Sequence, residues 1–508
     1  MTSAADLPET SAGARRIRGR LIRGSGIYLL TSTALRLIGF AVLSIYSRFL
    51  TPRDFGIVSI AESVSLAVGI VAGLGLENAA RRLYFQYSAD NTMLRSYLGT
   101  VFRLAGAAGA IILAFAYLLG PWVVSRFVET SPIHFFPYLA LPIATAISSQ
   151  LLSCSLVVFQ CQERHLAYSG FVALQSLLTT LFTLGLVVFT HHGAVGLLFA
   201  RALGTCLTLI VAAIVAIPLL RSATDSTYIR ETLHISIPLM FHALMAAGLV
   251  VIDRFILQHY RPLSEVGLYS VAYSFGMMMT LFSGSIYRGW APLFYSLHQN
   301  GKEGRETAGK ISGDLMLLMS LLGCAGSLVA PFCVRWLFDR RYWAAASIAP
   351  ILICAYLCHS GFTFFQLSLI QVRRTLLVSV ASGVALCSNV AFNLAWIPKF
   401  GIVGAAFATL AAYGIEVGLA AILAQRANRL PYGWLRPSVA LLVGALGLAC
   451  SQRTLFTVST SIIVSAILAG GVVLATRNLF RTARDAAKNK CPPSFTVSSP
   501  SIGPDRNR

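Results

Sequence analysis

Four arginines lie within runs of apolar residues that are long enough to cross a lipid bilayer: Arg36, Arg103, Arg201 and Arg288. A charge at bilayer depth costs about 2.5–3.5 kcal/mol on insertion scales, so such a side chain usually faces protein or a water-filled cavity. The guanidinium fork suits phosphate oxygens, which it binds in pairs. Arg36 lies far from either end of its run, whereas Arg103 and Arg288 lie nearer run ends, where snorkelling to an interface is an equal alternative.

Three carboxylates also fall within apolar runs, at Glu62, Asp314 and Glu416. Intramembrane acids commonly pair with basic groups, although they can instead carry a coupling proton. We favour pairing, and therefore expect these acids to be counter-charges, with ion coupling as the alternative. Because arginines outnumber acids within the N-terminal half, we predict a cationic cavity that binds an anionic substrate.

The composition places these charges in a membrane protein. Of the 508 residues, 56% are hydrophobic and only 12% charged, and the mean hydropathy is +0.72. Soluble domains carry about 25% charged residues. The net charge of +21 comes from short segments between apolar runs, as the positive-inside rule predicts, rather than from one soluble basic face. We therefore expect contact with membrane lipids and no nucleic-acid partner.

The apolar runs predict about fourteen membrane-spanning helices, because each run is close to the roughly 20 residues that cross a bilayer. Placing the N-terminus in the cytoplasm puts most of the 40 Lys and Arg residues on the cytoplasmic side, which predicts that both termini are cytoplasmic. The predicted spans are 25–47, 54–76, 98–119, 136–158, 167–190, 194–220, 234–257, 266–287, 311–334, 344–369, 375–397, 401–424, 433–450 and 457–476.

The first twelve spans form two copies of a six-helix unit. "SRFL…DFGIVSIA" (47–61) aligns with "DRFI…EVGLYSVA" (253–272), and "GAVGLLFA" (193–200) aligns with "GIVGAAFA" (401–408). Repeats with an even number of spans are parallel, and two such lobes can rock around a central cavity. The aligned pairs are Arg48 with Arg254, Gly56 with Gly267, Pro142 with Pro350 and Arg164 with Arg373. The predicted divisions are a basic arm (1–23), an N-terminal lobe (24–220), a linker (221–232), a C-terminal lobe (233–428), two further helices (429–478) and a disordered tail (479–508).

Some residues in the repeat have an architectural interpretation. Pro142, Pro238 and Pro350 interrupt spans 4, 7 and 10, and a proline in a membrane helix frees a carbonyl and permits a kink. Kinks of this kind serve either a rocking motion or plain packing. Arg48 and Arg254 lie at the ends of aligned spans, so we interpret them as hinge or interface residues rather than substrate contacts.

Motifs of soluble enzymes are missing from the sequence. It contains no Walker loop, no HExxH, no nucleophile elbow and no Gly-rich dinucleotide turn. The ten cysteines are scattered, and Cys354 with Cys358 offers too few ligands for a metal. We therefore predict a transporter rather than an enzyme, with no cofactor and no metal.

Five segments together resemble the Wzx-type polysaccharide flippases, which export O-antigen or exopolysaccharide, within the multidrug/oligosaccharidyl-lipid/polysaccharide (MATE-like) superfamily. The resemblance covers roughly residues 22–425 and is specific as a combination. The segments are "SRFLTPRDFGIVSIAES" (47–63), "IPLMFHALMAAGLVVIDRFIL" (237–257), "EVGLYSVAYSFG" (265–276), "RWLFDRRYWAAASIAPIL" (335–352) and "NLAWIPKFGIVGAAFATLAAYG" (393–414).

The resemblance implies a protein of the bacterial inner membrane that flips undecaprenyl-diphosphate-linked oligosaccharides from the cytoplasmic to the periplasmic leaflet. It implies two six-helix lobes in a V, alternating access, a cationic central cavity and a proton or sodium gradient as the energy source. It also implies that the protein acts together with a polysaccharide polymerase and export machinery. The alternatives are a lipid II flippase, a multidrug exporter of the same fold and a membrane polysaccharide polymerase. An exporter of cationic drugs should have an acidic cavity, and a polymerase usually has a large periplasmic loop that the short connectors here do not provide.

Overall fold

The computed structural model describes residues 31, 33–127, 134–220, 225–298 and 301–432. Within these ranges the chain forms helices and no strand. Ten of the described helices are long and apolar enough to cross a membrane. These findings confirm the prediction of an all-α polytopic membrane protein. The predicted spans 433–450 and 457–476 lie outside the described residues, so the count of fourteen stays a prediction.

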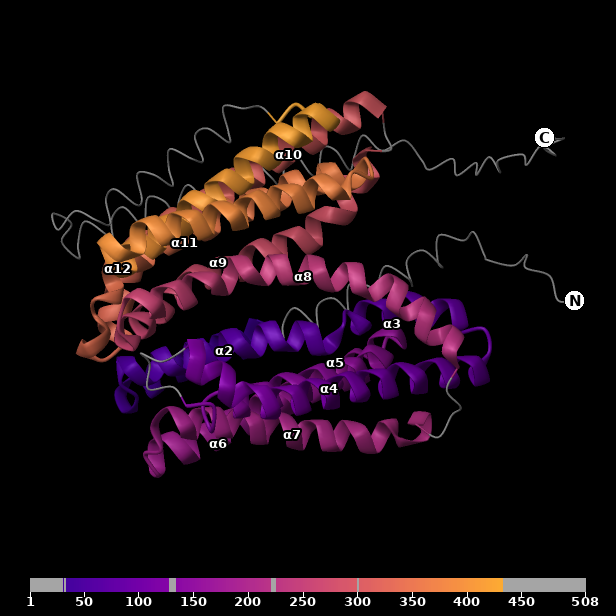
Figure 1. Ribbon diagram of the computed structural model, residues 1–508. Coiled ribbons are helices and arrows are strands. Elements are labelled where there is room, and N and C mark those ends of the chain that lie inside the picture. Colours follow the sequence, from indigo (N-terminus) through magenta and orange to yellow (C-terminus); the bar gives the residue numbers. More distant parts are fainter. Residues whose placement is uncertain (1–30, 32, 128–133, 221–224, 299–300, 433–508) are drawn as a thin grey trace, which may run out of the picture.

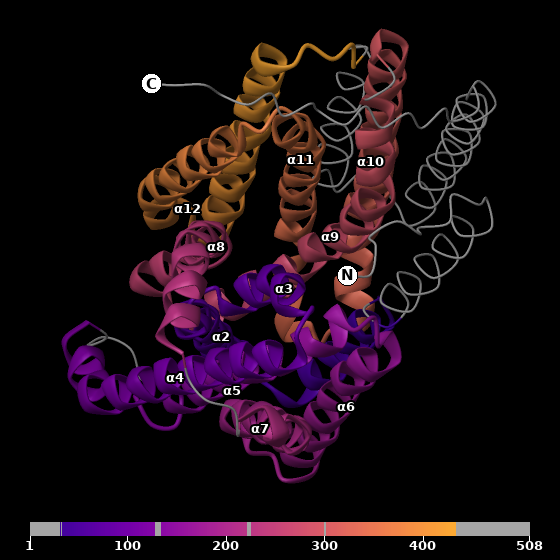
Figure 2. The ribbon, with the colours of Figure 1, turned by 90° about the vertical axis from the view of Figure 1, so that its right-hand side faces the viewer.

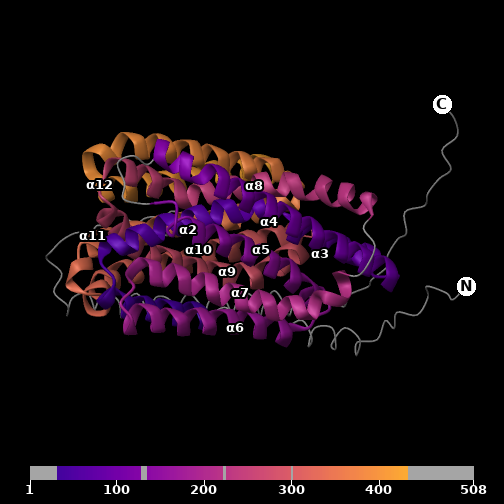
Figure 3. The same cartoon turned by 60° about the horizontal axis from the view of Figure 1, so that its bottom comes forward.

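The helices follow one another in two lobes and run along a common direction (Figures 1 and 3). The α8 helix begins within the stretch predicted as a linker. The N-terminal lobe contains a helix over residues 33–49, α2 (Pro52–Gly73), α3 (Leu76–Tyr87), α4 (Asn91–Phe127), α5 (Ala140–Cys161), α6 (His165–Thr183), the π-helical η1 (Leu184–Phe189) and α7 (Gly193–Leu220). The C-terminal lobe contains α8 (Ser226–Tyr260), α9 (Leu263–His298), α10 (Gly301–Leu337), the short 3₁₀ helix η2 (Arg340–Tyr342), α11 (Ala345–Gln371) and α12 (Thr375–Ala427).

Four helices bring the lobes together. Figure 2 shows α4 to α7 on one side and α10 to α12 on the other, with α2, α3, α8 and α9 between them. In the contact pattern, α2 packs against both α8 and α9, and α3 packs against α8. The largest buried apolar cluster contains residues of both lobes, including Phe55 from α2 and Tyr269 from α9. Any site between the lobes is therefore walled by α2, α8 and α9.

The turn before α2 caps that helix, and the start of α2 packs against the start of α9 in the other lobe. Thr51 and Asp54 form a capping box, and Pro52 occupies the first turn, where its missing N–H costs nothing. Such a cap contributes about 1 kcal/mol to helix stability. A Cβ on Gly56 would lie 1.9 Å from the Leu263 carbonyl oxygen, and a Cβ on Gly267 would lie 1.8 Å from that of Pro52. The two aligned glycines thus let the starts of α2 and α9 cross backbone to backbone.

A second pair of equivalent positions supports the duplication. Gly193 begins α7 with φ 56°, and Gly401 bends α12 with φ 57°. This left-handed backbone favours glycine. Asp54 lies beside Gly193, and Glu265, at the matching place in the second lobe, lies beside Gly401. Gly401 is the first residue of the predicted span 401–424, and its non-helical backbone separates α12 into two helices, which correspond to the predicted spans 375–397 and 401–424.

The structure corrects two details of the repeat. Arg164 and Arg374 are the N-caps of α6 and α12, and the residues before them, Glu163 and Arg373, both have positive φ, 56° and 58°. The backbone therefore pairs Arg164 with Arg374, one residue away from the predicted partner Arg373. Pro142 lies in the first turn of α5, where no backbone N–H is needed. It does not interrupt the helix as predicted.

Candidate functional site

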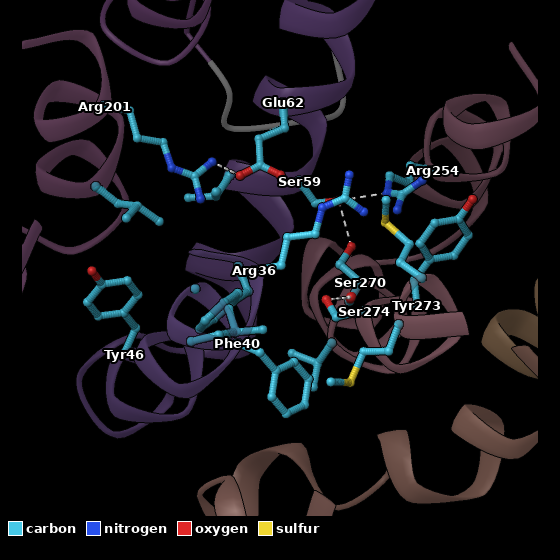
Figure 4. A pocket seen from close by; sticks show the side chains of 18 of the residues that line it. Arg36, Phe40, Tyr46, Ser59, Glu62, Arg201, Arg254, Ser270, Tyr273 and Ser274 are labelled. Carbon is cyan, nitrogen blue, oxygen red and sulfur yellow. Dashed lines mark hydrogen bonds and ion pairs between the residues drawn. The ribbon is translucent and has the colours of Figure 1, made fainter. Parts of the chain in front are cut away.

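A cavity of about 450 Å³ lies between the lobes (Figure 4). Its walls come from the helix over residues 33–49, α2 and α7 of the first lobe, and from α8 and α9 of the second. The charged side chains on its wall are three arginines and one glutamate: Arg36, Arg201, Arg254 and Glu62. Arginines therefore outnumber acids on the cavity wall.

The Arg201 guanidinium forms an ion pair with the Glu62 carboxylate across the N-terminal lobe. Arg201 comes from α7 and Glu62 from α2, one turn beyond Ser59. Both side chains stay accessible within the cavity, at 40% and 50% exposure. An accessible pair of this kind is worth only about 0–1 kcal/mol. An incoming anion can therefore take over the guanidinium at little cost.

Arg254 is held much more tightly than Arg201. It is 8% exposed, and its neighbour Asp253 is fully buried. The Arg254 guanidinium donates to Asp253 Oδ1 at 3.3 Å and to Ser59 Oγ at 3.0 Å, and it lies 4.1 Å from the ring centre of Tyr273. Because Ser59 is in α2 and Arg254 is in α8, this network joins the lobes at the cavity wall. Arg254 thus lies at a lobe interface and on the cavity wall at once.

Arg36 contributes the most accessible positive charge. It lies on the helix over residues 33–49 and is exposed to the cavity. Figure 4 shows its guanidinium facing the same space as Arg254 and the Arg201–Glu62 pair. The described residues provide no ion pair to Arg36. An anion that bridges Arg36 and Arg201 would thus meet two guanidinium forks from different helices.

The other predicted site residues lie away from the cavity. Arg103 is half-buried in α4, and Arg288 is exposed in α9 near Ser285. Asp314 is half-buried in α10. Pro238 and Pro350 lie inside α8 and α11. The remaining two are Glu416, buried in α12 beside His359, and Arg48, whose carbonyl accepts a hydrogen bond from Arg341 of the other lobe at 3.1 Å.

Several polar residues of the site were missed by sequence reasoning. Ser270 donates to Ser59 at 2.6 Å, and Tyr269 donates to Asp253. Serine and tyrosine are common in membrane helices, so their types alone give no signal. Asp253 was a usable signal in the sequence, because it directly precedes the aligned Arg254 in "DRF" and a buried arginine needs a counter-charge. Within the described part of the chain, no group of three or more His, Cys, Asp or Glu side chains could hold a metal ion.

Residues 21–298, more than half of the chain, match the family described as polysaccharide biosynthesis protein. The chain belongs to this polysaccharide biosynthesis family. It is also 22% identical over 405 residues to protein 1 of the Lsg locus of Haemophilus influenzae, a match that covers 76% of this chain and 95% of the relative. Together these findings confirm the resemblance to polysaccharide flippases.

Solved structures share the fold of this polysaccharide biosynthesis protein at low sequence identity. The lipid II flippase MurJ in an inward closed conformation matches with a TM-score of 0.72 at 13% identity, covering 90% of this chain and 99% of MurJ. An inward-facing multidrug resistance MATE family transporter of the MOP superfamily matches with a TM-score of 0.63 at 13% identity, covering 83% and 96%. A MOP superfamily transporter from Pyrococcus furiosus, titled for the reverse polarity of its binding pocket, matches with a TM-score of 0.52 at 14% identity, covering 86% and 96%. The two-lobed MATE-like fold is thereby confirmed.

Proposed function

We propose that this protein is a flippase for undecaprenyl-diphosphate-linked oligosaccharides, which it moves from the cytoplasmic to the periplasmic leaflet by alternating access. The polysaccharide products would be exopolysaccharide, O-antigen or capsule. The observation that carries the proposal is the cavity shared by both lobes, with Arg36, Arg201 and Arg254 on its wall against the single acid Glu62. A diphosphate is the part of such a substrate that guanidinium groups bind best.

The size of the cavity limits which part of the substrate it can hold. A volume of about 450 Å³ lies within the roughly 300–1,000 Å³ of small-molecule sites. That space suits a diphosphate with an adjoining sugar. The long prenyl chain would stay in the hydrocarbon region, where its transfer costs nothing. The aromatic and methionine side chains on the cavity wall, including Phe40, Tyr273 and Met277, provide apolar contact for a sugar face or the first prenyl units.

The cellular setting is part of the proposal. A lipid-linked intermediate that is polymerised outside the cytoplasm requires the bacterial inner membrane. The Lys and Arg distribution favours cytoplasmic termini, which would make the Thr51–Asp54 turn periplasmic. We further propose that a proton or sodium gradient drives the cycle and that a polysaccharide polymerase and export proteins receive the product. The protein then catalyses no bond-making step of its own.

The proposal is tested by binding and by transport in vesicles. Purified protein is reconstituted with undecaprenyl-diphosphate-linked oligosaccharide carrying a fluorescent sugar, and movement between leaflets is followed by quenching from one side. Arg36→Ala and Arg201→Ala should slow movement, whereas Arg288→Ala, which alters an exposed arginine of α9 away from the cavity, should not. Wild-type movement in the Arg36→Ala, Arg201→Ala double variant would refute the assignment.

A lipid II flippase is the second candidate, favoured by the likeness to MurJ in fold. It shares the diphosphate and the prenyl chain, so the cationic cavity fits it equally. The two candidates separate in competition. If lipid II displaces the labelled oligosaccharide carrier much better than an unlabelled copy of that carrier does, the second assignment replaces the first. A multidrug exporter is disfavoured, because a cationic drug would meet three arginines.

A further inference from the structure

A histidine–glutamate pair with a buried carboxylate lies within the C-terminal lobe, apart from the residues that line the cavity. Nδ1 of His359 on α11 is 2.9 Å from Glu416 Oε2 on α12, and Ser382 donates to Glu416 Oε1 at 2.8 Å. Glu416 is 1% exposed, whereas the His359 side chain is 33% exposed. The histidine thus connects a buried carboxylate with the exterior of the lobe.

We propose that the His359–Glu416 pair is a proton-binding site, and that proton binding there raises the affinity of the central cavity for an anionic diphosphate. In the proton-free state a neutral His359 donates its Nδ1–H to an ionised Glu416, so the pair carries one negative charge. A proton that binds at Nε2 of His359 converts the pair into imidazolium and carboxylate, with no net charge.

A column of aromatic side chains connects this pair with the cavity. The ring of His359 lies 4.9 Å from that of Tyr413, Tyr413 lies 5.6 Å from Tyr356, and Tyr356 lies 5.4 Å from Tyr273. Tyr273 lines the cavity and contacts Arg254 at 4.1 Å. Each ring comes from α9, α11 or α12, so a shift of α11 against α12 reaches the cavity wall through packed contacts.

The sign of the effect follows from the charges. Groups around the pair that can titrate or carry charge come from four helices: Tyr356, Cys354 and Cys358 of α11, Tyr413 of α12, Tyr273 of α9 and the Asp253–Arg254 pair of α8. From α10, Ser327 contacts Cys354. The Asp253–Arg254 pair is neutral overall, so the His359–Glu416 pair changes the net charge of this set when it titrates. Proton binding removes a negative charge and makes the potential at the cavity more positive. Diphosphate binding must then promote proton binding by the same factor.

The inference rests on the proposed function only for its ligand, so the test separates the two. A short-chain prenyl diphosphate is titrated into the purified protein by calorimetry at about pH 7, within the histidine range, in two buffers of different ionisation enthalpy. The difference gives the number of protons taken up on binding. Wild type should take up more protons than Glu416→Gln, because that substitution removes the carboxylate that stabilises an imidazolium at His359. Glu306→Gln, an exposed change at the start of α10, should match wild type.

Equal proton uptake by wild type and Glu416→Gln would overturn the inference while leaving diphosphate binding, and hence the proposed function, intact. If no variant binds the prenyl diphosphate, the proposed function fails and infrared difference spectra between about pH 5 and pH 8 decide the proton site. A carboxylate or imidazole signal that disappears in both Glu416→Gln and His359→Gln would support it. Spectra unchanged by both substitutions would overturn it. Thermal unfolding of each variant is measured alongside, and a misfolded variant is replaced by Ser382→Ala, which removes one hydrogen bond to Glu416.

Discussion

Replacing Glu62 by glutamine should tighten diphosphate binding, because Glu62 pairs with the Arg201 guanidinium to which the proposed substrate would bind. The Arg201–Glu62 pair is 40% and 50% exposed, so breaking it costs at most about 1 kcal/mol. Removing the competitor returns up to that amount to the substrate. The dissociation constant should therefore fall by up to about five-fold.

Loss of the arginine itself should have a larger and opposite effect. A hydrogen bond to a charged group contributes about 1.5–3 kcal/mol, and in wild type up to about 1 kcal/mol of that is offset by displacing Glu62. Arg201→Ala should then weaken binding by roughly 2- to 150-fold. In the Glu62→Gln background the same substitution should cost more, because no competitor remains. The effect of Arg36→Ala on binding should depend less on Glu62, because the described residues give Arg36 no ion pair.

The assay is a double-mutant cycle with an undecaprenyl diphosphate probe, read by calorimetry or by tryptophan quenching in nanodiscs. Arg288→Ala provides the matched arginine control outside the cavity. Binding energies are compared at low and moderate salt, because screening reduces exposed pairs first. Weaker binding in Glu62→Gln, or an Arg201→Ala effect that is independent of Glu62, would refute the role of Glu62 as an internal competitor.

Three other predictions follow from the contacts between and within the lobes. Gly267→Val should cost about 1–3 kcal/mol of stability and separate the lobes, because its Cβ would lie 1.8 Å from the Pro52 carbonyl oxygen. A wild-type melting temperature and unchanged crosslinking between α2 and α9 would contradict this. Gly401→Ala should destabilise α12 by about 1 kcal/mol, because alanine resists φ 57°, and circular dichroism melts would show an unchanged midpoint if that reasoning fails. Hydrogen bonds from the Arg341 backbone and side chain lower the pKa of Asp339. The stability that Asp339 contributes is therefore present above the ordinary carboxyl range near pH 4 and is lost as the pH falls through the lowered pKa. Asp339→Asn should remove this acid dependence, and melts of the variant below about pH 4 that match wild type would count against it.

The apolar runs, the two-fold repeat and the presence of Arg36, Arg201 and Glu62 at membrane depth could be predicted from the sequence. Burial in a bilayer requires long apolar helices and makes each charge within them conspicuous. The pairing of Gly56 with Gly267 was also readable, because both glycines stand at equivalent distances from a helix start. The polysaccharide flippase family could be recognised because its segments occur in order along one chain.

The partners of each charged group were decided by the tertiary structure. Arg36, Arg103, Arg201 and Arg288 look alike in sequence, and which helices face one another determines that Arg36 and Arg201 line the cavity while Arg103 and Arg288 do not. Glu62 meets Arg201 and Glu416 meets His359, although nothing in the local sequence links these residues. Ion pairs and hydrogen bonds act over a few ångströms in space, and the spacing along a chain of helices does not specify which faces meet. The sequence by itself therefore determined which charges lie within the apolar runs, and the packing of α2, α7, α8 and α9 decided which of them form one site.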